Sequence, residues 1–258
     1  MKRIIMIKVL DKAFGILELL TISSPDAVRP SKIAELLNIN NATCSRILKD
    51  LNYAGYTEKI SREAGYTIGP RAFTFSKQLN YNTDLINAAE HHVEGCARKL
   101  KASVILVELK NNQRYILLHN DYNVNSTIRI DKLSYTDLFK TATGVLLLAY
   151  GGIEERKNAL KKYGLPSEFF FEDISSVKEY YKILDNIKSK GFAYYDKDKI
   201  NTSIYALPIF KGKEMIAALG ATFIGGLALN KNKESLLNKV KDTAKKINET
   251  LSPINYIG

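Results

Sequence analysis

The sequence predicts an α+β fold in two domains, and three observations support this. The first 70 residues hold short amphipathic helical patterns followed by a strand–turn–strand pattern. After residue 100, strand patterns alternate with helical ones, which is typical of helices packed on a mostly antiparallel sheet. The length of 258 residues exceeds the common size of a single domain, so the chain has room for both parts.

Two helical patterns open the N-terminal part. The first has apolar residues at helical spacing, which are Val9, Leu10, Ala13, Ile16, Leu17 and Leu20. Pro30 and Ser31 then give a helix start signal, because proline suits the first turn and a hydroxyl can cap it. The helix that follows is expected to bury one stripe, made of Ile33, Ala34, Leu36 and Leu37.

A tight turn and a third helix come next. The turn spans Asn38 to Asn41, and asparagine accepts the left-handed conformation that such turns need. Either Asn40 or Asn41 can cap the following helix. One face of this helix has the i, i+3, i+4, i+7 spacing of a buried stripe, formed by Cys44, Ile47, Leu48 and Leu51. The third helix therefore has a second face left for contacts.

That second face suits contacts with base edges and phosphates, because its residues are short, polar or basic. We call it the recognition face; it consists of Asn41, Ala42, Thr43, Ser45, Arg46 and Lys49. The alternative is an ordinary solvated helix face on which Arg46 pairs with Asp50 at i+4.

A short hairpin pattern follows the third helix. Residues 56–60 and 66–68 favour β structure, and a polar turn from Ser61 to Gly65 separates them. Such a hairpin beyond a recognition helix is placed like the wing of a winged helix-turn-helix, whose helix fits the major groove of DNA. We therefore expect Lys59 and Arg62 on the flanking DNA backbone.

The rest of the chain divides into a linker and a larger domain. We expect domain boundaries at residues 1–70, 71–84 and 85–258, with a helix over 71–79 and a polar linker over 80–84. Strands are predicted over 103–109, 114–118, 126–130, 192–195, 203–210 and 215–223. Helices are predicted over 85–100, 141–150, 154–163, 177–190 and 233–251.

Composition narrows the class of protein. The formal net charge is +11, and +5 of it falls in residues 1–80, which favours a polyanionic partner. Two cysteines give no disulfide framework, so a cytoplasmic protein is expected. The basic and apolar start passes directly into a helix and lacks a cleavage site, and no apolar run is long enough to span a membrane.

The N-terminal domain resembles the DNA-binding domain of the IclR family of bacterial and archaeal transcription regulators. The resemblance lies in Ile33-Ala34, the Thr43-x-x-Arg46-x-Leu48-x-x-Leu51 run, Gly55-Tyr56 and Tyr66-x-Ile68-Gly69. The family's usual Lys-Ser-Thr opening of the recognition helix is Asn41-Ala42-Thr43 here. This departure leaves the operator sequence open.

The C-terminal domain is similar to the effector-binding domain of the same family, a relative of GAF and profilin-like sensors. The matching stretches are Thr141-Ala142-x-Gly144-x-x-Leu147-Leu148-Ala149, Gly191-Phe192-Ala193, Ala206-Leu207-Pro208-Ile209 and Ala217-Ala218-Leu219. The resemblance implies an N-terminal winged helix-turn-helix joined by linker helices to a GAF/profilin-like α/β effector-binding domain. It also implies a homodimer or dimer of dimers that binds double-stranded operator DNA, responds to a small organic acid and needs no cofactor.

The expected effector site begins at a helix N-terminus. Backbone N–H groups and hydroxyls at Thr141, Thr143 and Gly144 can hold a carboxylate. The alternative is that Thr141 only caps the helix and Gly144 only allows close packing. The resemblance adds Asn201, Thr202 and Ser203 as pocket residues, and Tyr205 can line an apolar wall with Tyr122 and Phe139. Ile204 stands where the family often has cysteine, so the effector's identity stays open.

Catalytic and metal sites have little support in the sequence. His91 and His92 are adjacent on a predicted helix and point about 100° apart, so they do not suit one metal ion. Phosphate loops, nucleophile elbows and CxxC pairs are missing, and the paired acids have the pattern of solvated surface. We expect no enzyme and no metal site. The main alternative to a DNA-binding regulator is a small-molecule sensor or assembly module whose winged helix makes protein contacts.

Overall fold

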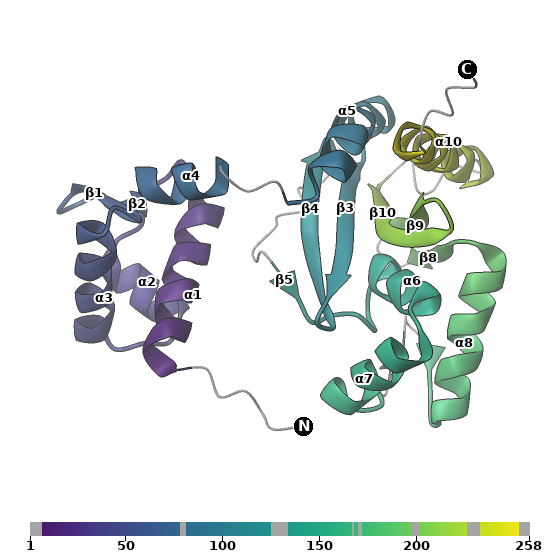
Figure 1. The fold of residues 1–258 in the computed structure, drawn as a ribbon, viewed down its shortest axis with the longest axis horizontal. Helices are drawn as coiled ribbons and strands as arrows, with labels where there is room; N and C mark the ends of the chain where they lie inside the picture. Colours follow the sequence, from purple (N-terminus) through teal and green to yellow (C-terminus); the bar gives the residue numbers. More distant parts are fainter. Residues whose placement is uncertain are drawn as a thin grey trace, which may run out of the picture. The chain divides into compact units, whose positions relative to one another are not determined.

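The chain folds into two compact units, of which the first ends at Tyr81 and the second begins at Asn82. The structure is a computed structural model that describes residues 7–77, 81–124, 134–166, 168–169, 172–197, 202–225 and 233–252. Figure 1 shows the elements of each unit. Each unit has its own hydrophobic core, so the two are described separately.

The first unit is a winged helix-turn-helix, as the sequence predicts. Its elements are α1 (Lys8–Ser23), α2 (Pro30–Leu36), α3 (Asn41–Tyr53), the hairpin strands β1 (Thr57–Ser61) and β2 (Gly65–Ile68), and α4 (Pro70–Lys77). The predicted turn chemistry is confirmed at Asn38, whose φ of 52° is left-handed. Asn40 caps α3, because its side chain accepts hydrogen bonds from the backbone N–H groups of Ala42 and Thr43 at 2.8 and 3.4 Å.

One glycine fixes the wing against the chain that precedes α2. Val28 and Tyr66 exchange backbone hydrogen bonds in both directions, of 2.8 and 3.0 Å. Gly65, beside them, has a φ of 102°, and a Cβ atom there would lie 2.3 Å from the carbonyl oxygen of Val28. Only glycine fits such a position, because any side chain would collide with the Val28 backbone. Gly65 therefore allows the wing to pair with the segment before α2.

The core of the first unit is smaller than the apolar pattern predicts. Its buried members are Ile16, Leu20, Ile33, Ala34, Cys44, Ile47 and Leu48. Val9 and Leu10 are exposed. The first residue of α1 that packs against this core is Ala13, so the first turn of the helix lies beyond the core. Leu36 is also exposed, contrary to the expected stripe on α2. Periodicity located the correct faces but overestimated how far along each helix the core extends.

The second unit is built on a six-stranded antiparallel sheet in the order β5-β4-β3-β10-β9-β8. These strands are β3 (Ser103–Lys110), β4 (Gln113–Asp121), β5 (Ser134–Tyr135), β8 (Ala193–Lys197), β9 (Thr202–Lys211) and β10 (Glu214–Ile224). β9 and β10 form the longest pairing, and β3 joins β10 to β4. A separate two-residue pair consists of β6 (Glu168–Phe169) and β7 (Glu172–Asp173).

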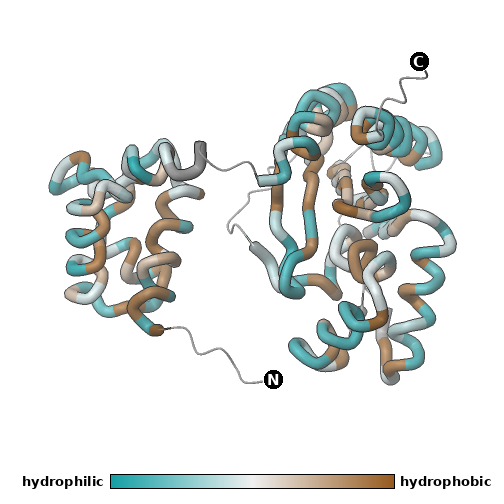
Figure 2. The backbone as a smooth tube through the Cα atoms, viewed as in Figure 1, coloured by the Kyte–Doolittle hydropathy of each residue, from teal (hydrophilic) through white to brown (hydrophobic). Residues whose placement is uncertain are grey.

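Helices cover both faces of this sheet (Figure 1). α5 (Thr83–Leu100) and α10 (Lys233–Leu251) pack on one face, against Val104, Leu106 and alternate residues of β9 and β10. α6 (Ala142–Tyr150) and α8 (Val177–Lys190) pack on the other face, and α7 (Ile153–Tyr163) lies between them in sequence. Every residue of α6 from Ala142 to Ala149 is buried, which explains its uniformly apolar sequence. In Figure 2, α8 by contrast alternates hydrophilic and hydrophobic colours.

The predicted elements differ from the structure mainly at short strands. β5, β6 and β7 have two residues each, which is too short for a periodic signal. The strand predicted over 126–130 lies outside the described residues. Among the described residues, no helix combines the length and apolar character needed to cross a membrane.

Candidate DNA-binding surface and effector site

The recognition face lies on the solvent side of α3. Ile47 and Leu48 are buried on the opposite side, as is the free thiol of Cys44. Five residues of the recognition face are exposed and Thr43 is half-buried; the exposed ones are Asn41, Ala42, Ser45, Arg46 and Lys49. The Asn40 side chain already accepts hydrogen bonds from the backbone N–H groups of Ala42 and Thr43. The polar groups that this face offers to a partner are therefore its side chains.

Four basic side chains on α3 and the wing are exposed and lack a neutralising partner. They are Arg46, Lys49, Lys59 and Arg62. Within the described ranges, none of the four is in an ion pair, so the alternative pairing of Arg46 with Asp50 is not formed. The wing also has two exposed acids, Glu58 and Glu63, which lower its net charge. The four cations are nevertheless free to meet phosphates.

Three contacts that sequence reasoning missed hold the wing and α3 as one body. Asn52 Nδ2 donates to the carbonyl oxygen of Thr57 at 2.9 Å, across the junction of helix and strand. Arg71, at the start of α4, donates to the carbonyl oxygen of Ala54 at 3.1 Å. Its guanidinium also lies over the ring of Tyr56, 5.1 Å from the centroid. The arrangement of cations on α3 and the wing is thereby fixed.

The expected effector site begins at the first turn of α6. Thr141 caps this helix, because its hydroxyl accepts a hydrogen bond from the Gly144 N–H at 3.1 Å. A Cβ atom at Gly144 would lie 2.5 Å from the carbonyl oxygen of Leu138, so glycine is required for close packing. Thr141 therefore acts as a helix cap and Gly144 allows close packing, as the alternative interpretation of the sequence states. In the first turn of α6, this leaves only the backbone N–H groups of Ala142 and Thr143 for an anion.

The structure brings the α6 N-terminus to a polar patch at one end of the sheet. A Cβ atom at Gly220 would lie 2.7 Å from the Thr143 methyl, so α6 touches β10 there. On the same face of the sheet as Gly220, the adjoining ends of β3, β4 and β10 carry a polar patch. It consists of Ser103, His119, Asp121 and Thr222. His119 Nε2 lies 3.0 Å from Ser103 Oγ. Strand pairing joins His119 to Ser103 and Thr222, which lie far from it in the sequence.

The remaining effector candidates do not gather at one place. Asn201 lies outside the described residues, while Thr202 and Ser203 are buried at the start of β9. Ser203 donates to Asp196 Oδ1 at 2.8 Å, and Asp196 also pairs with Lys233.

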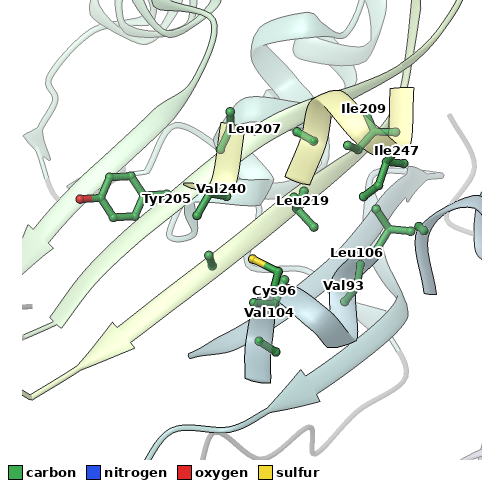
Figure 3. Packing of buried hydrophobic residues seen from close by; sticks show 14 of the residues in the cluster. Val93, Cys96, Val104, Leu106, Tyr205, Leu207, Ile209, Leu219, Val240 and Ile247 are labelled. Atoms are coloured by element: carbon green, nitrogen blue, oxygen red, sulfur yellow. The ribbon is translucent and has the colours of Figure 1, made fainter. Parts of the chain in front are cut away.

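Tyr205 lies on the wrong face for the predicted pocket. It belongs to the cluster packed against α5 and α10 (Figure 3). Its hydroxyl donates to the carbonyl oxygen of Lys233 at 3.2 Å. Its neighbour Ala206 faces the α6 side, because side chains alternate along a strand. Ser203, two residues before Tyr205 on the same strand, faces the same way as Tyr205. A small ligand cannot contact Thr143 together with Ser203 or Tyr205, so this grouping is corrected. Phe139 is core, packed edge-on against Tyr163 and Tyr180.

An open groove of about 730 Å³ lies between α5 and α10, and no sequence signal pointed to it. It is lined by His91, His92, Gly95, Cys96, Lys99, Leu100, Glu234, Ser235, Asn238, Lys239, Asp242, Thr243 and Lys246. Burial raises the pKa of the Cys96 thiol, which disfavours a reactive thiolate. The part of the chain that the structure describes holds no cluster of three histidine, cysteine or acidic residues suited to a metal ion.

His119 makes stability depend on pH. Burial lowers the pKa of His119 below its ordinary 6.5, against a smaller opposing effect of Asp121. The unfolded chain therefore binds more protons than the folded one below about pH 6.5, and the free energy of unfolding falls as the pH drops from 7 to 5. In urea unfolding at both pH values, His119→Asn should lose less stability than wild type. His91→Asn, on the exposed side of α5, is the matched control; equal losses in all three proteins would contradict the prediction.

Comparison with known proteins gives a consistent result. The family described as bacterial transcriptional regulator IclR C-terminal matches residues 78–249. The HTH-type transcriptional regulator KdgR of Escherichia coli (strain K12) is 23% identical over 218 residues, which cover 82% of this chain and 80% of that protein. An uncharacterised HTH-type transcriptional regulator of Haemophilus influenzae is 22% identical over 232 residues, covering 86% and 85%.

Solved structures share the fold over nearly the whole chain. An IclR homologue from Microbacterium hydrocarbonoxydans, complexed with 4-hydroxybenzoate, matches with a TM-score of 0.73 and 20% identity, covering 94% of this chain and 98% of that one. The Thermotoga maritima IclR matches with a TM-score of 0.64 and 20% identity, covering 95% and 98%. With a family match over two thirds of its length, together with the winged helix-turn-helix and the antiparallel sheet, this chain belongs to the IclR family of transcriptional regulators.

Proposed function

We propose that the protein is a sequence-specific DNA-binding transcription regulator that responds to a small organic acid and acts in the cytoplasm. The observation that carries the proposal is the set of four exposed, unpaired cations on α3 and the wing. Asn52 and Arg71 hold these two elements together, so the cations form one preorganised surface. Such a surface suits a duplex, because a helix enters the major groove while a hairpin contacts the flanking backbone.

In this proposal, each residue of the surface has a distinct task. Arg46 and Lys49 reach bases or phosphates from the middle of α3, and Lys59 and Arg62 bind the backbone beside it. Asn41, Ala42, Thr43 and Ser45 lie near the helix N-terminus, where base edges are read in helix-turn-helix complexes. Ala42 offers only a methyl group, which suits the methyl of thymine.

The effector site that we propose lies between the first turn of α6 and the polar patch. Thr141, Thr143 and Gly144 form its helix side, and Thr202 lies on the same face of the sheet at the start of β9, whereas Ser203 faces the other way and is not part of the site. Ser103, His119 and Thr222 add hydroxyl and imidazole groups that suit a ligand with hydroxyl or carboxyl oxygens. The complex of the Microbacterium homologue with 4-hydroxybenzoate supports a small organic acid as the effector class. Ligand binding would shift the population of conformers that match two half-sites.

A homodimer through α1 fits this mechanism. Ile7, Leu10 and Phe14 are 66%, 44% and 52% exposed and, with half-buried Leu17, follow the 3-4-3 spacing of a coiled-coil seam. Figure 2 shows the hydrophobic colour at this end of α1. Single exposed apolar residues are ordinary, whereas a stripe of them marks an interface.

Phe14→Glu should reduce the mass of the oligomer in sedimentation experiments, because the seam would then bury a charge without a partner. The matched control is Ile153→Glu, which adds the same charge at an exposed apolar residue of α7. A Phe14→Glu protein with the wild-type mass would show that α1 is not the interface.

The direct test of the proposed function is selection of duplexes from a random library by the full-length protein. Enrichment of one sequence, with an affinity that falls steeply as salt rises, is expected because phosphate contacts release counterions. Failure to enrich any duplex would favour the alternative, a sensor or assembly module whose winged helix contacts proteins. For the effector, thermal stabilisation of the protein by aromatic and aliphatic acids, without turnover, would support sensing.

A further inference from the structure

Tyr53, the last residue of α3, is an unusually exposed aromatic side chain. It is 95% exposed, more than any other large apolar or aromatic side chain among the described residues. Within the described part of the chain, its hydroxyl has no hydrogen-bond partner, whereas its neighbour Asn52 is bonded to the wing. Fold stability thus gives no reason for a tyrosine at this position.

Helix geometry places Tyr53 in line with the central cations of the recognition face. Arg46, Lys49 and Tyr53 are spaced three and four residues apart, so their side chains lie on one side of α3. That side is directly opposite the buried stripe of Cys44, Ile47 and Leu48. Tyr53 lies about 6 Å beyond Lys49 along the helix axis, at a rise of about 1.5 Å per residue. A duplex that contacts Arg46 and Lys49 therefore passes close to Tyr53.

We propose that the Tyr53 hydroxyl donates a hydrogen bond to a DNA phosphate at the C-terminal end of the recognition helix. This inference rests on the proposed function. A phosphate is the expected acceptor because base edges are read near the N-terminus of a recognition helix, whereas its C-terminal end meets the backbone. The phenol hydroxyl is an uncharged donor on a long, rigid side chain, so it can reach a phosphate beyond the end of the helix.

The neutrality of tyrosine gives the contact a distinctive signature. Each lysine or arginine that neutralises a phosphate adds to the salt dependence of binding, because condensed counterions are released. A tyrosine hydroxyl adds affinity without adding to that dependence. Tyr53→Phe and Lys49→Ala should therefore both weaken binding but differ in how the affinity responds to salt.

The experiment uses the full-length protein and the duplex that wild type enriches from a random library. Tyr53→Phe should lower the affinity about tenfold, the effect of losing one hydrogen bond to a charged group, with the salt slope unchanged. The same loss should appear on a duplex of scrambled sequence, because a phosphate contact carries no sequence information. Lys49→Ala should instead reduce the magnitude of the salt slope by about one.

Matched measurements separate the possible failures. Tyr181→Phe removes a hydroxyl from α8 and should leave DNA affinity unchanged. Because Tyr53 is exposed and unbonded, Tyr53→Phe should also keep the wild-type melting temperature. Unchanged affinity for Tyr53→Phe, or a loss confined to the enriched sequence, would overturn the phosphate contact and leave the proposed function standing. If wild type enriches no duplex, the proposed function fails and the contact fails with it.

Discussion

Arg46→Ala is expected to lower the affinity for the enriched duplex by about 1–3 kcal/mol, which is roughly five- to 150-fold. Arg46 is exposed in the middle of the recognition face and has no ion pair among the described residues, so it meets DNA without first breaking a protein contact. An arginine on this face of a recognition helix can bind guanine through two hydrogen bonds. Fluorescence anisotropy with labelled duplexes measures the loss.

The pattern of loss distinguishes a base contact from a phosphate contact. If Arg46 reads a base, Arg46→Ala should relax specificity at one position of the enriched sequence and bind the scrambled duplex nearly as well as wild type does. Lys161→Ala removes one positive charge from exposed α7 and serves as the control. Equal affinities of Arg46→Ala and Lys161→Ala would show that Arg46 does not contact DNA.

Arg156→Ala is expected to lower the free energy of unfolding of the second unit by about 2–5 kcal/mol. The Arg156 guanidinium is buried and donates to the carbonyl oxygens of Leu148 and Ala149 at 3.1 and 2.5 Å. Both carbonyls belong to the last turn of α6, where they have no partner within the helix. Each buried acceptor left without a donor costs about 1–3 kcal/mol.

The ion pair of Arg156 with Asp185 should contribute little to that loss. The Asp185 side chain is 67% exposed, so solvent screens its interaction at 2.8 Å. Asp185→Asn should therefore cost less than about 1 kcal/mol in the same urea unfolding experiment. If Asp185→Asn were as destabilising as Arg156→Ala, the ion pair would be the main contribution and the capping of α6 would be secondary.

The sequence determined the features that depend on neighbouring residues. Asn38 and Asn40 define the turn and cap of the helix-turn-helix, because their side chains act on backbone within a few residues. The apolar spacing of α3 separated its buried and exposed faces, and the exposed face contains the candidate DNA contacts. The sequence also allowed the prediction that Thr141 caps α6, because a cap involves only the first turn of its own helix.

The tertiary structure decided what depends on distant segments. Only strand pairing joins Ser103 with Asp121 and Thr222, and only the packing of α6 on β10 brings Thr143 to that patch. The same pairing places Tyr205, and Ser203 two residues before it, on the opposite face, which their positions in the sequence do not reveal. How far a core extends is equally non-local, so Val9, Leu10 and Leu36 have apolar spacing and yet lie outside the core of the first unit. The physical reason is that periodicity fixes the direction of a side chain along its own element, whereas packing partners are set by elements far away in the chain.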